Sequence, residues 1–94
     1  MAIQFLVHEP GDSVGVVVVE GVTTGQELNG WIMDSNETLK VKVLSAIPIG
    51  HKLALKDLAS GDTVIKYGVD IGRTIAPIKV GEHLHVHNVK TKRW

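Results

Sequence analysis

The stretch Leu58-Ala-Ser-Gly-Asp-Thr-Val64 is followed later in the chain by a close counterpart, Ile78-Lys-Val-Gly-Glu-His-Leu84. Each has an apolar residue, two intervening residues, a glycine, an acidic residue, one further residue and a second apolar residue. A glycine in such a break permits the positive φ of a tight turn. Turns of this kind recur in small β domains in which long, bent hairpins wrap around each other. The two stretches therefore predict an all-β fold.

Short β-strands are predicted between the ten glycines and three prolines of the chain. Residues 14–20 are an almost unbroken run of valine, the pattern of a strand covered on both faces. Residues 38–43 alternate apolar and polar side chains, which indicates a strand with one buried face. The other predicted strands are residues 3–8, 27–33, 51–55, 63–67, 73–78 and 83–89. Residues 56–59 could form a single helical turn.

Length and composition limit the class of protein. The 94 residues are enough for one domain, residues 1–94. Ten basic and ten acidic side chains give a net charge of zero with neutral histidines, which argues against nucleic acid as a partner. The absence of cysteine excludes a disulfide framework, a cysteine zinc site and a thiol nucleophile. No apolar run is long enough to cross a membrane, and the start does not read as a signal peptide, so we expect a soluble cytoplasmic protein.

The strongest chemical signal is the alternation of His83, His85 and His87. Side chains at alternate positions of a strand share one face, so the three imidazoles are expected to project together. Neighbouring imidazoles suit a divalent transition metal. A solvated strand face that binds nothing fits the same pattern equally well. Spacing alone leaves both interpretations open.

Other polar residues near glycine are weaker candidates. His51 and Lys52 could bind an anionic substrate, with the lysine on a carboxylate and the histidine transferring protons, although a histidine that caps the turn is the simpler alternative. His8 ends the first predicted strand and is ambiguous by itself. Lys66 and Tyr67 could orient a carboxylate, but a lysine on an edge strand is usually solvated. Asp62 and Glu82 lie in predicted turns and are expected to be structural.

The chain carries no glycine-rich phosphate loop, no serine–histidine–aspartate arrangement and no spaced carboxylate pair. A domain of this size also has little material with which to enclose a pocket that excludes water. We therefore expect the isolated chain to be inactive and a second polypeptide to supply most of any catalytic site.

An ordered series of motifs covers most of the chain. In chain order, the motifs are Pro48-Ile-Gly-His-Lys-Leu-Ala-Leu55, Gly61-Asp-Thr-Val-Ile-Lys-Tyr-Gly68, Ile71-Gly-Arg73, Ala76-Pro-Ile78 and Gly81-Glu-His-Leu-His-Val-His-Asn88. Together they closely resemble the N-terminal SAF-type domain of the altronate and galactarate dehydratases. The resemblance implies a small SAF domain of the β-clip kind. In the dehydratases this domain is commonly fused to a much larger catalytic region. Biotin- and lipoyl-carrier domains use similar turns, but their lysine motifs do not occur here.

Two further features resemble a narrower family. Gly30-Trp-Ile-Met33 and the ending Lys90-Thr-Lys-Arg-Trp94 look most like the small (alpha) subunits of (2R)-sulfolactate sulfo-lyases, in which the same architecture is split over two polypeptides. The implied reaction is the removal of sulfite from 3-sulfolactate to give pyruvate. Two alternatives are a subunit of an altronate- or galactarate-type sugar-acid dehydratase, and a non-catalytic module that docks on a large subunit or holds substrate.

The resemblance implies a partner, a cofactor and roles for individual residues. The partner is a large catalytic lyase subunit, the substrate is a small 2-hydroxy acid, and association into a homo-oligomer stays open. The cofactor is a divalent metal of the Fe²⁺ type, for which this chain can offer His85 and His87, although the large subunit could hold it instead. The remaining candidates are catalytic His51, Lys66 and Tyr67 and substrate-binding His8, Lys52 and Asn88.

Overall fold

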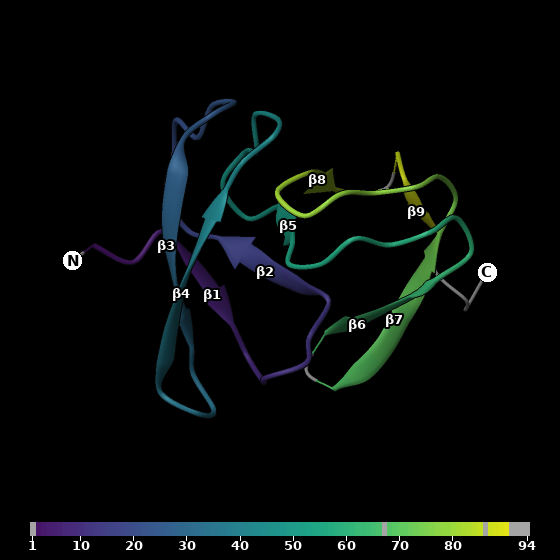
Figure 1. The fold of residues 1–94 in the computed structure, drawn as a ribbon, viewed down its shortest axis with the longest axis horizontal. Helices are drawn as coiled ribbons and strands as arrows, with labels where there is room; N and C mark the ends of the chain where they lie inside the picture. Colours follow the sequence, from purple (N-terminus) through teal and green to yellow (C-terminus); the bar gives the residue numbers. More distant parts are fainter. Residues whose placement is uncertain (1, 67, 86, 91–94) are drawn as a thin grey trace.

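The computed structural model describes residues 2–66, 68–85 and 87–90, and every regular element within these ranges is a β-strand (Figure 1). The strands are β1 (Phe5–Val7), β2 (Val14–Val17), β3 (Glu27–Ile32), β4 (Glu37–Lys42), β5 (Lys52–Ala54), β6 (Thr63–Lys66), β7 (Val69–Thr74), β8 (His83–Leu84) and β9 (Val89–Lys90). The predicted all-β fold is confirmed. The described ranges contain no helix that could cross a membrane.

The strands form two sheets. One has the order β4-β3-β1-β2-β5-β8 and the other the order β6-β7-β9. β1 pairs in parallel with β3 and antiparallel with β2. Figure 1 shows β2 and β5 between the β1–β3–β4 part of the molecule and the β6–β7–β9 sheet. The first residues of the histidine-rich segment thus form an edge strand, β8, which pairs with β5.

Apolar side chains pack in two clusters. The first surrounds Phe5, whose ring is fully buried against two glycines, since an added Cβ on Gly15 or Gly30 would overlap it. Its other buried members are Val7, Val17, Val22, Leu28, Val41, Val43, Ile47 and Leu53. The second cluster contains Val14, Ala54, Leu58, Val64, Ile78 and Leu84. Full burial of a leucine such as Leu84 contributes about 2 kcal/mol, which anchors the histidine segment on this second core.

Most predicted strands are confirmed, with shorter bounds than predicted. Residues 3–8, 14–20, 27–33, 38–43, 51–55 and 63–67 contain β1 to β6 in order, apart from one residue at the start of β4. In β4, Val41 is buried while Lys40 and Lys42 are exposed, as the alternation predicts. β2 ends at Val17, and the valine that follows is already 39% exposed. The valine run is therefore apolar beyond the point at which its strand ends.

Three predictions of local structure are wrong. Residues 73–78 are not one strand, because β7 ends at Thr74 and Ile78 lies in an isolated bridge with Leu58. The same bridge replaces the helical turn predicted for residues 56–59. Residues 83–89 are broken after Leu84, since the backbone N–H groups of Asn88 and Val89 both donate to the carbonyl of His85 and turn the chain.

One type of β-turn recurs five times within the described residues. In each, the N–H of the fourth residue donates to the carbonyl of the first, and the third residue is a glycine at positive φ. The turns are residues 9–12, 23–26, 48–51, 59–62 and 79–82. The residues directly before four of these turns pair in antiparallel bridges, Val22 with Ile47 and Leu58 with Ile78. The fold therefore repeats one unit, of which the sequence analysis detected two copies.

Candidate functional site

Three histidines from two neighbouring strands meet at one edge of the six-stranded sheet. His51 directly precedes β5, His83 begins β8 and His85 directly follows it, and β5 pairs with β8 so that Leu53 lies opposite His83. The Nδ1 atom of His51 is 2.8 Å from the Nε2 atom of His83. The rings of His51 and His85 stack with their centroids 3.8 Å apart. We call these three residues the histidine cluster.

The geometry of the histidine cluster suits a metal ion. One ring nitrogen from each of its histidines lies within 4.8 Å of those of the other two. Two nitrogens bound to one zinc ion at about 2.0–2.1 Å each lie at most about 4.2 Å apart, so the rings would have to move slightly closer to converge on one ion. All three side chains are partly exposed, so a bound ion could also reach a substrate or a partner protein.

The pKa values of two of these histidines are lowered from their ordinary range. Desolvation is the largest cause for His83, followed by repulsion from His87, His51 and His85. Desolvation also lowers the pKa of His85, with further contributions from His51, Lys52 and His87. Both rings are therefore neutral at pH 7, which is the protonation state that metal ligation requires.

His87 occupies a different place from the one that a continuous strand would give it. It lies in the turn after β8, is exposed, and its ring centroid is 5.0 Å from that of His83. The predicted pair of metal ligands, His85 and His87, is thus separated: His85 belongs to the histidine cluster, and His87 flanks it. Which of them binds metal stays a prediction.

The turn that carries His51 differs from the other four at two linked positions. In those four, a side-chain oxygen of the fourth residue accepts a hydrogen bond from the backbone N–H of the first, at 2.8–3.2 Å. The accepting residues are Asp12, Gln26, Asp62 and Glu82. In the fifth turn the first residue is Pro48, which has no N–H, and the fourth is His51. Because no donor needs an acceptor there, the imidazole of His51 is available to contact His83 and His85.

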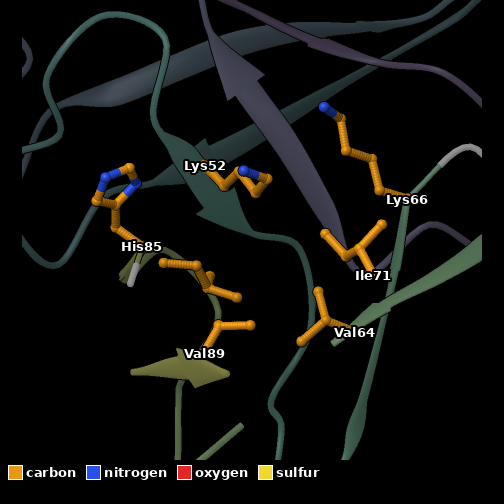
Figure 2. Close-up of a pocket in the computed structure, with 7 residues that line it drawn as sticks. Lys52, Val64, Lys66, Ile71, His85 and Val89 are labelled. Carbon is orange, nitrogen blue, oxygen red and sulfur yellow. The ribbon is translucent and has the colours of Figure 1, made fainter. Parts of the chain in front are cut away.

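A cavity of about 320 Å³ opens beside the histidine cluster (Figure 2). His85, Lys52 and Lys66 lie along one side of it, with Lys52 in the middle, and apolar side chains form the rest. The apolar lining residues are Val64, Ile71, Leu84 and Val89. Among the described lining residues none is acidic. The cavity therefore combines an apolar floor with a positive side, which suits a small anion.

The two lysines of the cavity influence each other. Lys52 is partly buried, and this burial, followed by repulsion from Lys66, lowers its pKa from the ordinary lysine value. His51 and Lys52 are adjacent in the chain, yet one belongs to the histidine cluster and the other to the cavity. The sequence prediction of an anion site at these two residues is thus compatible with their positions and stays a prediction.

The remaining predicted site residues are dispersed. His8 lies outside the histidine cluster and lines a second cavity of about 230 Å³, which it shares with Lys66. Asn88 is buried: its side chain accepts a hydrogen bond from the N–H of His85 and donates one to the carbonyl of His83. Asn88 therefore fixes the backbone that carries the two histidines. Tyr67 lies outside the described residues.

The expectation that Asp62 and Glu82 are structural is confirmed by their turn hydrogen bonds. Sequence analysis did not place His83 among the metal ligands, and it gave Pro48 no role beyond its place in a family motif. The repeated turn could have identified both. Aligning the five turns by their glycines shows that only one lacks an acceptor at its fourth residue, and that this same turn begins with proline.

The all-β fold with its repeated turns and the histidine segment at a sheet edge define a small β domain of the SAF type. Residues 3–92 match the family described as the altronate/galactarate dehydratase SAF domain. The chain belongs to this family.

Individual relatives agree with that assignment. The chain is 65% identical over 94 residues to the (2R)-sulfolactate sulfo-lyase subunit alpha of Chromohalobacter salexigens, covering all of both chains. It is 51% identical over 63 residues to the protein of the same name from Paracoccus pantotrophus, covering 67% of this chain and 94% of that one. It is also 43% identical over 53 residues to an altronate dehydratase of Bacillus subtilis, of which those residues make up only 11%.

Proposed function

We propose that this chain is the small subunit of a two-subunit lyase that eliminates sulfite from (2R)-3-sulfolactate and gives pyruvate. The observation that carries the proposal is the 65% identity, over the whole of both chains, to a protein named as subunit alpha of such a lyase. The histidine cluster and the positive cavity next to it provide side chains suited to an anionic substrate. A cytoplasmic location stays a prediction from the sequence.

The chemistry requires two bonds to break. The proton on C2, next to the carboxylate, goes to a base, and its electron pair forms the C2–C3 double bond. The C3–S bond breaks, and its electron pair leaves with the sulfur as sulfite. The resulting enol of pyruvate then loses its hydroxyl proton and takes up a proton on C3, which gives the keto acid. The proton on C2 is weakly acidic, so the site must stabilise the negative charge that develops on the carboxylate.

A divalent metal ion of the iron type fits the donor set of this chain. Three imidazole nitrogens within 4.8 Å of one another are ligands that such ions accept, and two of the imidazoles have lowered pKa values. We propose that His51, His83 and His85 hold the ion, with His87 as a neighbouring ligand or proton acceptor. When bound, the metal supplies a positive charge that polarises the carboxylate and hydroxyl of a 2-hydroxy acid.

The large subunit is proposed to complete the site. The histidine cluster is partly exposed and the cavity is open, so this chain alone does not exclude water from a substrate. His51 is the candidate for proton transfer if the partner supplies the metal ligands instead. For the same reason, we expect the isolated chain to release no sulfite.

The test is sulfite release from 3-sulfolactate by this chain co-expressed with its large subunit. We expect His51→Ala and His85→Ala, each in a complex of unchanged stoichiometry, to lower the rate at least about a hundredfold, the order of loss for removal of a metal ligand or its support. Lys40→Gln, on the exposed face of β4, is the matched control and should keep the full rate.

Two outcomes would contradict the proposal. Release of water from altronate in place of sulfite from sulfolactate would identify a sugar-acid dehydratase subunit. A full rate from an assembled His51→Ala/His85→Ala complex would leave this chain a docking module with no part in the chemistry.

A further inference from the structure

The cavity beside the histidine cluster is lined by one imidazole and two amino groups. His85 lies at one end, and the amino groups of Lys52 and Lys66 extend along the same side of the cavity (Figure 2). The three come from different segments: Lys52 begins β5, Lys66 ends β6, and His85 follows β8. The fold therefore brings two lysines from separate sheets to a single opening beside potential metal ligands.

The surroundings of these lysines favour an anion. The cavity floor is apolar, and none of the described lining residues carries a negative charge. Lys52 is partly buried and Lys66 lines the same cavity, so the two positive charges repel each other. An anion placed between the two amino groups would relieve this repulsion, and its interaction with each would be stronger than on an open surface because the site is partly desolvated.

We propose that Lys52 and Lys66 bind the second acidic group of the substrate, so that the cavity selects small dianionic 2-hydroxy acids over monoanionic ones. This rests on the proposed function, in which the first acidic group and the hydroxyl face the histidine cluster. The volume of about 320 Å³ is at the lower end of the range for small-molecule sites, which suits a three-carbon acid.

For sulfolactate, the second acidic group is the sulfonate that leaves. When the C3–S bond breaks with its electron pair on sulfur, the departing group changes from a sulfonate with one negative charge to sulfite with two. Positive charge at Lys52 and Lys66 interacts more strongly with the departing sulfite than with the bound substrate, and this difference is what accelerates a reaction. Lys52 and Lys66 would then both select the dianionic substrate and stabilise the departing sulfite.

The test is calorimetric titration of the assembled complex with two non-reacting acids, malate and lactate. Malate carries a carboxylate where sulfolactate carries its sulfonate, and lactate carries only a hydrogen atom there. We expect the wild-type complex to bind malate about tenfold more tightly than lactate, or better, the order expected for hydrogen bonds to a charged group. Lys52→Gln and Lys66→Gln should each reduce this ratio toward one without changing the affinity for lactate.

The matched control is Lys79→Gln, an exposed lysine that does not line the cavity, which should leave the ratio unchanged. A wild-type ratio near one, or a ratio retained in both cavity variants, would overturn the inference. These titrations need no turnover, so they are separable from the proposed function: that function fails if no sulfite is released, whatever the binding ratio. For an active complex, the inference also requires both cavity variants to lower kcat with sulfolactate.

Discussion

The imidazoles of His51 and His83 approach within hydrogen-bonding distance, which requires one nitrogen to carry a proton and the other to accept it. Protonating both rings would remove the acceptor. The stacked ring of His85 adds a third group that opposes positive charge on His83. At the scale of single residues, these contacts favour the neutral forms of His83 and His85, and neutral imidazole is the form that binds a metal or accepts a proton.

The pH dependence of the free energy of unfolding should reveal this preference for neutral imidazoles at His83 and His85. The pKa values of His83 and His85 are lower in the folded chain than the ordinary value of about 6.5 in the unfolded one. As the pH falls below about 6.5 the unfolded chain binds these protons first, so the free energy of unfolding decreases until the lowered folded-state pKa values are passed. Chemical denaturation of the metal-free chain between pH 7.5 and 5 measures this decrease in the free energy of unfolding. His83→Asn/His85→Asn should flatten the profile, and parallel profiles for the two proteins would contradict the expectation.

Individual site residues could be predicted from the sequence only in part. His51, Lys52, Lys66 and His85 were candidates by residue type, and the structure places each of them in the histidine cluster or in the adjoining cavity. Their grouping was not predictable, because the alternation of histidines implied a strand where the chain actually turns. The side chain of Asn88 stabilises that turn through the backbone at His83 and His85, and nothing in the sequence distinguishes such a use from substrate binding.

At the scale of the elements, the five repeated β-turns show how one copy differs so that it can carry His51. Four turns satisfy the N–H of their first residue with a side chain of their fourth, a hydrogen bond with a net contribution of about 1 kcal/mol. The turn at residues 48–51 removes the donor with proline and replaces the acceptor with histidine. The two differences depend on each other, since a histidine in a turn with a free N–H would leave that group without its acceptor.

A double-mutant cycle tests this dependence. His51→Asp alone places a carboxylate where Pro48 offers no N–H, whereas Pro48→Ala/His51→Asp restores both donor and acceptor. We expect a coupling free energy of about 1 kcal/mol that favours the double variant, measured by denaturant unfolding. The cycle cancels the entropic effect of losing proline, which occurs in both arms. A coupling near zero would contradict the proposed link between the two positions.

The strands were predictable where one face alone is buried. β4 alternates and was located almost to the residue. Prediction was poorer where apolar residues continue past the end of a strand, as they do after β2, or where a strand is interrupted by side-chain hydrogen bonds, as at Asn88. Apolar composition reports burial, but the end of a strand is set by where its partner strand ends and by local turns.

At the scale of the whole molecule, sequence patterns did not indicate which strands pair. The parallel contact between β1 and β3 depends on a phenylalanine ring lying over Gly30, a fit that becomes visible only when the two strands are side by side. The result is a domain in which the histidine cluster joins segments 32 residues apart in the chain, as counted from His51 to His83. The candidate site is therefore a property of the assembled fold.

Metal binding at this site should stabilise the whole chain. An ion held by His51, His83 and His85 binds the folded state and not the separated segments, so at a hundredfold excess over its dissociation constant it adds about 2.7 kcal/mol to the free energy of unfolding. Thermal unfolding with and without Co²⁺ should show a rise in Tm of several degrees, absent in His51→Ala/His85→Ala. An equal rise in that variant would move the metal to other residues.

The position of β8 late in the chain also determines when, during synthesis, the histidine cluster can form. Strands β1 to β4 and all of their mutual pairings lie within residues 5–42, so they can associate while the remainder of the chain is still on the ribosome. His51 meets His83 only once the last segment has been synthesised and β8 has joined the sheet beside β5. A nascent chain can therefore form most of its larger sheet before the complete histidine cluster can form. Under the proposed function, metal capture by the histidine cluster would therefore follow the pairing of β8 with β5.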